Sequence, residues 1–102
     1  MGETDEFTAS VRKLVGQIGH WTPPRWAAST ASGVTRAELV HGLVQWLADR
    51  AADAEGRPRR PVPRLDNDLA LPDQLRVVAA DLVAAGGAPG AVDRVDAIRR
   101  TL

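Results

Sequence analysis

The chain has 102 residues, the length of a single domain, and 44% of them are hydrophobic, which is enough for a buried core. Thirteen basic residues balance thirteen acidic ones, so no net charge attracts nucleic acid or an anionic membrane. The absence of cysteine excludes disulfides, thiolate metal sites and thiol nucleophiles, and it fits a cytoplasmic location. The acidic start, MGETDEF, is unlike a signal peptide, and no apolar run reaches membrane-spanning length.

The first predicted helix covers about residues 5–18. Its apolar side chains recur at helical spacing and form a single stripe, which would face a core. We expect Thr4 to cap the start of this helix and Gly19 to end it. The stripe consists of Phe7, Val11, Leu14, Val15 and Ile18.

The second predicted helix covers about residues 35–55 and has the clearest start signal in the chain. Thr35 and Glu38 form a capping box, in which a side chain and a backbone N–H group satisfy each other at the helix start. Trp46 falls on the apolar stripe of this helix, so we expect its indole to be buried. Gly56 is expected to end the helix.

The third and fourth predicted helices cover about residues 72–85 and 89–101, and they begin at Pro72 and Pro89. Because the connection between them is short, we expect these two helices to be antiparallel neighbours. No window alternates with the period of a strand. The predicted fold is therefore an all-α, compact bundle of about four amphipathic helices, a single domain over residues 1–102 with two long irregular connections.

The first long connection contains HWTPPRW, residues 20–26, which holds two of the three tryptophans. Its Pro-Pro step favours an extended polyproline II segment and not a helix. One interpretation is a partner-binding site formed by Trp26, Arg25, Pro24 and Trp21, because Trp and Arg are enriched at interface hot spots. In the other, the two indoles fold back and close one end of the bundle. We expect Trp21 to be buried and Trp26 to contact the partner.

The second long connection contains GRPRRPVPR, residues 56–64, which we call the Arg-Pro loop. Its four guanidinium groups on a proline-stiffened segment could bind phosphates or another anionic partner. We favour a solvated linker, neutralised by Asp66 and Asp68, because Arg and Pro also reflect the codon bias of a GC-rich bacterial genome. The candidate residues for an anionic partner are Arg57, Arg59, Arg60 and Arg64.

The remaining polar residues form no recognisable catalytic, metal-binding or cofactor motif. His20 and His41 have no second histidine at ligand spacing, and the DND sequence at residues 66–68 lacks the glycine and distal glutamate of a calcium loop. We expect Asp66 or Asp68 to act as a cap or turn residue.

The sequence as a whole predicts a non-enzymatic protein-interaction or accessory module from a bacterium, with no cofactor and no metal. Its partner would be another protein or a second copy of the chain. Binding of nucleic acid or a phosphate ligand through the Arg-Pro loop is the alternative, which the balanced charge does not favour.

Overall fold

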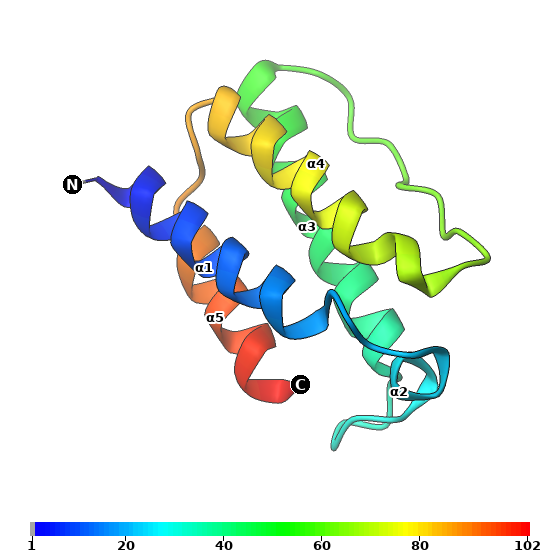
Figure 1. Ribbon diagram of the computed structural model, residues 1–102. Coiled ribbons are helices and arrows are strands. Elements are labelled where there is room, and N and C mark those ends of the chain that lie inside the picture. Colours follow the sequence, from blue (N-terminus) through cyan, green and yellow to red (C-terminus); the bar gives the residue numbers. More distant parts are fainter. Residues whose placement is uncertain (1) are drawn as a thin grey trace.

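The computed structural model describes residues 2–102, which form five α-helices and one short 3-10 helix (Figure 1). Met1, the first residue of the predicted domain, lies outside the described residues. No β-strand occurs within residues 2–102, so the prediction of an all-α bundle is confirmed. The elements are α1 (Glu3–Ile18), α2 (Pro23–Ala27), α3 (Arg36–Glu55), η1 (Asp68–Ala70), α4 (Leu71–Ala84) and α5 (Ala91–Thr101).

Helix α3 begins and ends at the residues that the sequence indicates. The hydroxyl of Thr35 accepts a hydrogen bond from the backbone N–H of Glu38 at 3.1 Å, which is the capping interaction expected of the T-x-x-E pattern. Gly56 follows the helix with a φ of 69°, a left-handed conformation that glycine adopts without strain.

Helices α1 and α5 begin at different residues from those predicted. Gly2, and not Thr4, occupies the N-terminal cap position of α1. Helix α5 begins at Ala91 and not at Pro89, because Gly90 before it has a φ of 80° and cannot continue a helix in that conformation. Both differences are two residues long, and both leave the apolar stripes of the helices unchanged.

The largest local difference is α2, which occupies the segment predicted to be extended. Pro23 and Pro24 are the first two residues of this helix, where a proline is accommodated because the first N–H groups of a helix have no intrahelical acceptor. The N–H groups of Arg25 and Trp26 both donate to the carbonyl oxygen of Thr22, at 3.0 and 3.2 Å. The polyproline II prediction is therefore wrong: the Pro-Pro step starts a short helix.

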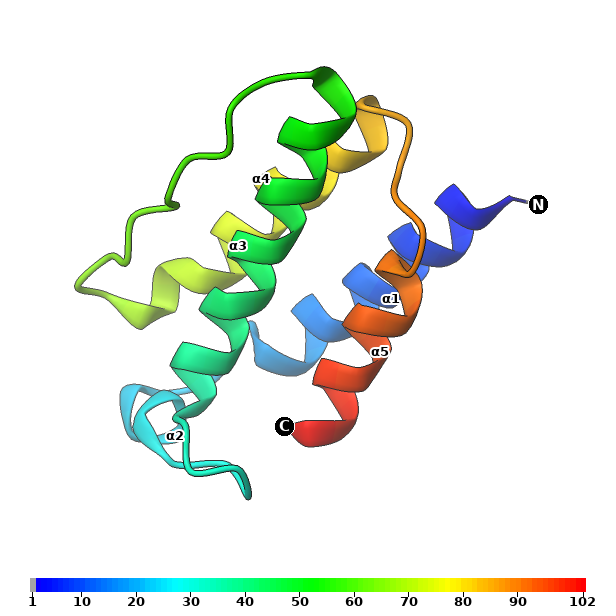
Figure 2. The ribbon, with the colours of Figure 1, turned by 180° about the vertical axis from the view of Figure 1, so that it is seen from behind.

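The four long helices form a ring in which α1 and α3 each pack on both α4 and α5. Helices α4 and α5 are at opposite corners of this ring, so the prediction that they pack as antiparallel neighbours is wrong. The short connection joins the end of α4 to the start of α5, but each of these two helices packs on α1 and α3 and not on the other (Figures 1 and 2).

Helices α3 and α4 run side by side in the same direction (Figures 1 and 2). A parallel pair needs a connection that returns along the whole first helix, which for the 20 residues of α3 is about 30 Å. Residues 56–67 make this return as an extended segment along the pair (Figure 2). The length of the second irregular connection therefore follows from the parallel arrangement.

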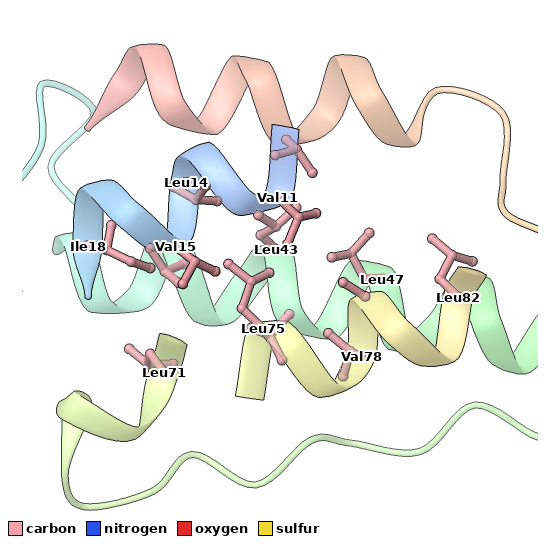
Figure 3. Close-up of a cluster of buried hydrophobic side chains, with 14 of the residues drawn as sticks. Val11, Leu14, Val15, Ile18, Leu43, Leu47, Leu71, Leu75, Val78 and Leu82 are labelled. Carbon is pink, nitrogen blue, oxygen red and sulfur yellow. The ribbon is translucent and has the colours of Figure 1, made fainter. Parts of the chain in front are cut away.

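The core lies inside the ring, where the apolar stripes of the helices meet. Figure 3 shows leucine and valine side chains of α1, α3 and α4 pointing toward one another. Helix α5 contributes Ala91 and Val95 to the same cluster. The largest wholly buried side chains are Trp26, Leu14, Ile18, Leu43, Leu47, Leu71, Leu75 and Leu82.

Trp46 is only half-buried, so the prediction of a buried indole is wrong for this residue. Its ring lies at the edge of the α3 stripe and packs on the core from outside. The guanidinium carbons of Arg50 and Arg94 lie 5.3 and 5.1 Å from the centre of the ring. These two arginines, one on α3 and one on α5, therefore cover part of the indole surface that the core leaves open, through cation–π contacts.

Candidate interaction surfaces

The two tryptophans of HWTPPRW are buried against each other at one end of the bundle. Trp26 has no exposed surface and Trp21 has 6%, and their ring centres lie 4.9 Å apart with the ring planes at 67°. This edge-to-face arrangement is a favourable aromatic contact. Trp21 is buried as expected, whereas the prediction that Trp26 contacts a partner is wrong, because the helical turn of α2 directs its indole into the core.

Arg25 and Pro24, the other two candidate partner-binding residues, are exposed on α2. The guanidinium carbon of Arg25 lies 5.0 Å from the centre of the Trp21 ring, and that of Arg36 lies 5.9 Å from it. The four candidate residues therefore do not form one surface: two are core, one stacks on the core from outside, and one is a helix-start proline.

The charges of the Arg-Pro loop are largely neutralised within the chain. Arg57 pairs with Glu55 at 3.2 Å, and Arg59 pairs with Asp53 through two hydrogen bonds of 2.9 and 2.7 Å. These contacts hold the pKa of the Asp53 carboxyl and that of the Glu55 carboxyl below their ordinary values.

At the far end of the loop, Arg64 pairs with Asp68, as the sequence suggested, whereas Asp66 forms no ion pair within residues 2–102. Arg60 also has no carboxylate partner in that range. Asn67, and not Asp66 or Asp68, caps η1, its side-chain oxygen accepting from the N–H of Leu69 at 3.0 Å.

The backbone of the Arg-Pro loop is fixed to α3 by Gln45 and His41, for which the sequence indicated no such role. The side-chain oxygen of Gln45 accepts from the N–H of Val62 at 2.7 Å, and its amide nitrogen donates to the carbonyl oxygen of Arg60 at 3.0 Å. Nε2 of His41 lies 3.0 Å from the carbonyl oxygen of Val62. The signal in the sequence was the four-residue spacing of His41 and Gln45, which places both on one face of a helix.

Helix α4 holds the same loop from the other side, so the loop covers the seam between α3 and α4. The amide nitrogen of Gln74 donates to the carbonyl oxygen of Pro63 at 3.1 Å. Between these anchors Val62 packs on the core. The loop is solvated, as favoured from the sequence, at every residue except Val62. What the sequence did not indicate is that its backbone is anchored on both sides and is part of the fold.

We predict that Gln45→Ala loosens the Arg-Pro loop and lowers the free energy of unfolding by about 1–2 kcal/mol, because two hydrogen bonds to the loop backbone are lost. Trypsin should then cleave after Arg59 and Arg64, the two loop arginines that no proline follows, faster than in the unchanged protein. Urea denaturation and limited trypsin digestion measure the two effects, with Gln17→Ala on α1 as the control. Unchanged cleavage in the Gln45 variant would contradict the anchoring role.

A groove of about 550 Å³ lies in the seam between α1 and α4. We call it the α1–α4 groove. Its lining is mostly apolar, and the only charged members among the described residues are Arg12 on α1 and Arg76 on α4, one on each wall. Arg76 also contacts the exposed carboxylate of Asp73 at 2.6 Å. The lining residues are Phe7, Thr8, Val11, Arg12, Val15, Arg76, Ala79, Ala80, Val83 and Ala84.

Apolar surface continues from this groove onto the outer face of α4. Val77 is 60% exposed, the highest value among the exposed large hydrophobic residues of the described chain. Ala80 and Ala84, which line the groove, are also exposed and follow Val77 at spacings of i+3 and i+7. These spacings place the three side chains on neighbouring positions of one helix face.

A second groove, of about 460 Å³, lies in the opposite seam of the ring, between α3 and α5. We call it the α3–α5 groove. Its apolar lining includes Leu39 and Ile98, and Ala97 lies on its α5 wall. Unlike the first groove it carries charges of both signs, from Glu38 and Arg94.

Within residues 2–102, no group of three or more His, Cys, Asp or Glu side chains lies close enough to hold a metal ion. His20 is exposed, and Nε2 of His41 already contacts the carbonyl oxygen of Val62 in the Arg-Pro loop. In the same range, no helix combines the length and the apolar character needed to cross a bilayer.

No protein-family model matches this chain, and no curated protein or solved structure is significantly similar to it. Its function is therefore inferred from the geometry of its own residues.

Proposed function

We propose that this protein is a non-enzymatic interaction module that binds another protein through the α1–α4 groove. The observation that carries the proposal is the groove itself, an apolar hollow of about 550 Å³ that continues onto the exposed face of Val77. Apolar surface of this kind, rimmed by polar residues, is typical of protein-binding sites. This surface replaces the tryptophan pair as the candidate site.

The covered seam of the same bundle supports this proposal. Between α3 and α4 the chain places its own extended segment, with Val62 on the core and hydrogen bonds on both sides. Within residues 2–102 no comparable segment covers the seam between α1 and α4. A partner segment in that groove would bury apolar surface that the chain leaves open, which favours association.

Binding of an anionic ligand through the Arg-Pro loop is the second candidate. Three of its four guanidinium groups already pair with carboxylates, so a phosphate would have to compete with contacts inside the chain. Since the chain also has no net charge, we rank this function below protein binding. We also propose a cytoplasmic location, because the chain contains no cysteine.

The test of the proposal is Ala80→Glu, which places a larger, charged side chain in the groove. Ala80 is exposed, so the change should leave the fold intact. Ala97→Glu makes the same change at an exposed position of the α3–α5 groove. We expect the unchanged protein and Ala97→Glu to retain the same partner from native cell extract, and Ala80→Glu to lose it by about tenfold or more. Equal retention by the two variants would contradict the proposal.

A further inference from the structure

We infer that the segment bound in the α1–α4 groove is an amphipathic α-helix with acidic residues along the edges of its apolar face. The inference rests on the proposed function and adds the chemistry of the partner. It depends on two properties of the groove: the sign of the charges on its walls and the scarcity of groups that could bind a peptide backbone.

The charges of the groove favour a partner with carboxylates. Arg12 and Arg76 are on opposite walls, and none of the lining residues that the structure describes is acidic. Arg12 has no carboxylate partner within residues 2–102. At Arg76 a partner carboxylate would compete with that of Asp73, whose side chain is 80% exposed, so water screens the existing pair strongly. A helix lying between the walls can direct an acidic residue to each arginine. The α3–α5 groove has no such preference, because Glu38 and Arg94 both line it.

The walls of the groove favour a helix over an extended segment. An extended segment needs hydrogen-bond partners for its backbone, as the Arg-Pro loop finds in Gln45, His41 and Gln74. Among residues 2–102, the lining of the α1–α4 groove includes no amide or imidazole side chain, and Thr8 is its only uncharged polar residue. A helix satisfies its own backbone groups and presents an apolar stripe, which is the helix-in-groove mode of recognition.

The dimensions of the groove set the length of the partner helix. The lining extends from Phe7 to Val15 on α1 and from Arg76 to Ala84 on α4. Eight residues of helix correspond to about 12 Å, so about two to three turns of a partner helix would lie along the walls.

The first experiment titrates isotope-labelled protein with two synthetic peptides of about 15 residues. Both carry Leu at i, i+3, i+4 and i+7, and the flanking polar positions are all Glu in one and all Lys in the other. We expect the Glu peptide to shift the amide NMR signals of residues 7–15 and 76–84 and to bind about tenfold more tightly than the Lys peptide. Equal binding of the two peptides, or shifts centred on the α3–α5 groove, would overturn the inference.

The second experiment measures the contribution of the two arginines. The double variant Arg12→Gln, Arg76→Gln should bind the Glu peptide about tenfold more weakly, since each exposed ion pair contributes modestly. Arg60→Gln, Arg100→Gln removes the same charge from exposed positions outside the groove lining and should change binding less than about twofold. A similar loss in both double variants would show a general charge effect and would overturn the inference.

The outcomes separate this inference from the proposed function. If Ala80→Glu abolishes capture of a partner but the two peptides bind equally, the groove is a docking site and the inference that its partner is an acidic helix is wrong. If the chain sediments as a dimer that Ala80→Glu dissociates, a second copy occupies the groove, and the inference of an acidic helix is overturned. If Ala80→Glu and Ala97→Glu capture the same proteins equally, the proposed function itself fails.

Discussion

Replacing Trp26 with alanine should lower the free energy of unfolding by about 3–5 kcal/mol, the usual cost of removing a buried aromatic ring. Its side chain is wholly covered, and it is the largest of the fully buried residues. A domain of this size has a total stability of about 5–15 kcal/mol, so the variant would be close to unfolding at ambient temperature. Urea denaturation followed by circular dichroism measures the loss.

Three further variants test whether burial of the ring explains this effect. Trp26→Phe should cost less than Trp26→Ala, because it keeps an aromatic ring and the indole N–H has no acceptor within residues 2–102. Trp21→Ala should also be strongly destabilising, since its ring packs edge-to-face on Trp26. Arg25→Ala on the exposed face of α2 should cost less than about 1 kcal/mol. A loss below about 1 kcal/mol for Trp26→Ala would show that the ring is at the surface.

Replacing Leu75 with alanine should lower the free energy of unfolding by about 2–5 kcal/mol, because it opens a cavity where the stripes of α1, α3 and α4 meet. Leu75 has no exposed surface, and its side chain points toward the α1 and α3 residues of the core (Figure 3). The matched control is Val77→Ala, two residues further along α4, where the side chain is 60% exposed. This change should stay within about 0.5 kcal/mol. Equal losses from the two variants would contradict the orientation of α4 in the ring.

The helices of this protein could be predicted from the sequence because their signals are local. The apolar stripes, the capping box of Thr35 and the left-handed Gly56 depend only on residues a few positions apart. The Pro-Pro step was ambiguous for the same reason. Pro23 and Pro24 fit both an extended segment and the first turn of a helix. In the structure they start a helix, and this helix packs Trp26 into the core.

The packing of the helices could not be predicted, because local patterns do not specify which helices become neighbours. The short loop after α4 suggested a neighbour in α5, whereas α4 packs on α1 and α3. The parallel course of α3 and α4 also gave the Arg-Pro loop its role. Gln45 binds the backbone of Val62, 17 positions away. A contact over this separation cannot be predicted from the residue spacing of a helix or a strand.

The candidate site depends on the same packing. Arg12 and Arg76 are ordinary exposed arginines in the sequence, and they face one groove only because α1 lies beside α4. The sequence pointed to the tryptophans as the partner-binding site because it shows the type of a residue but not whether its side chain is buried. Val77 was the accessible signal, since it is an apolar residue outside the buried stripe of α4.

Hydrogen–deuterium exchange of the protein bound to its captured partner tests the role of the α1–α4 groove most directly. The comparison is between the free protein and the complex, with protection measured along the whole chain. The groove as docking site predicts new protection in residues 7–15 and 76–84, and none in α5 or the Arg-Pro loop. Protection confined to residues 56–64, or to the walls of the α3–α5 groove, would contradict it.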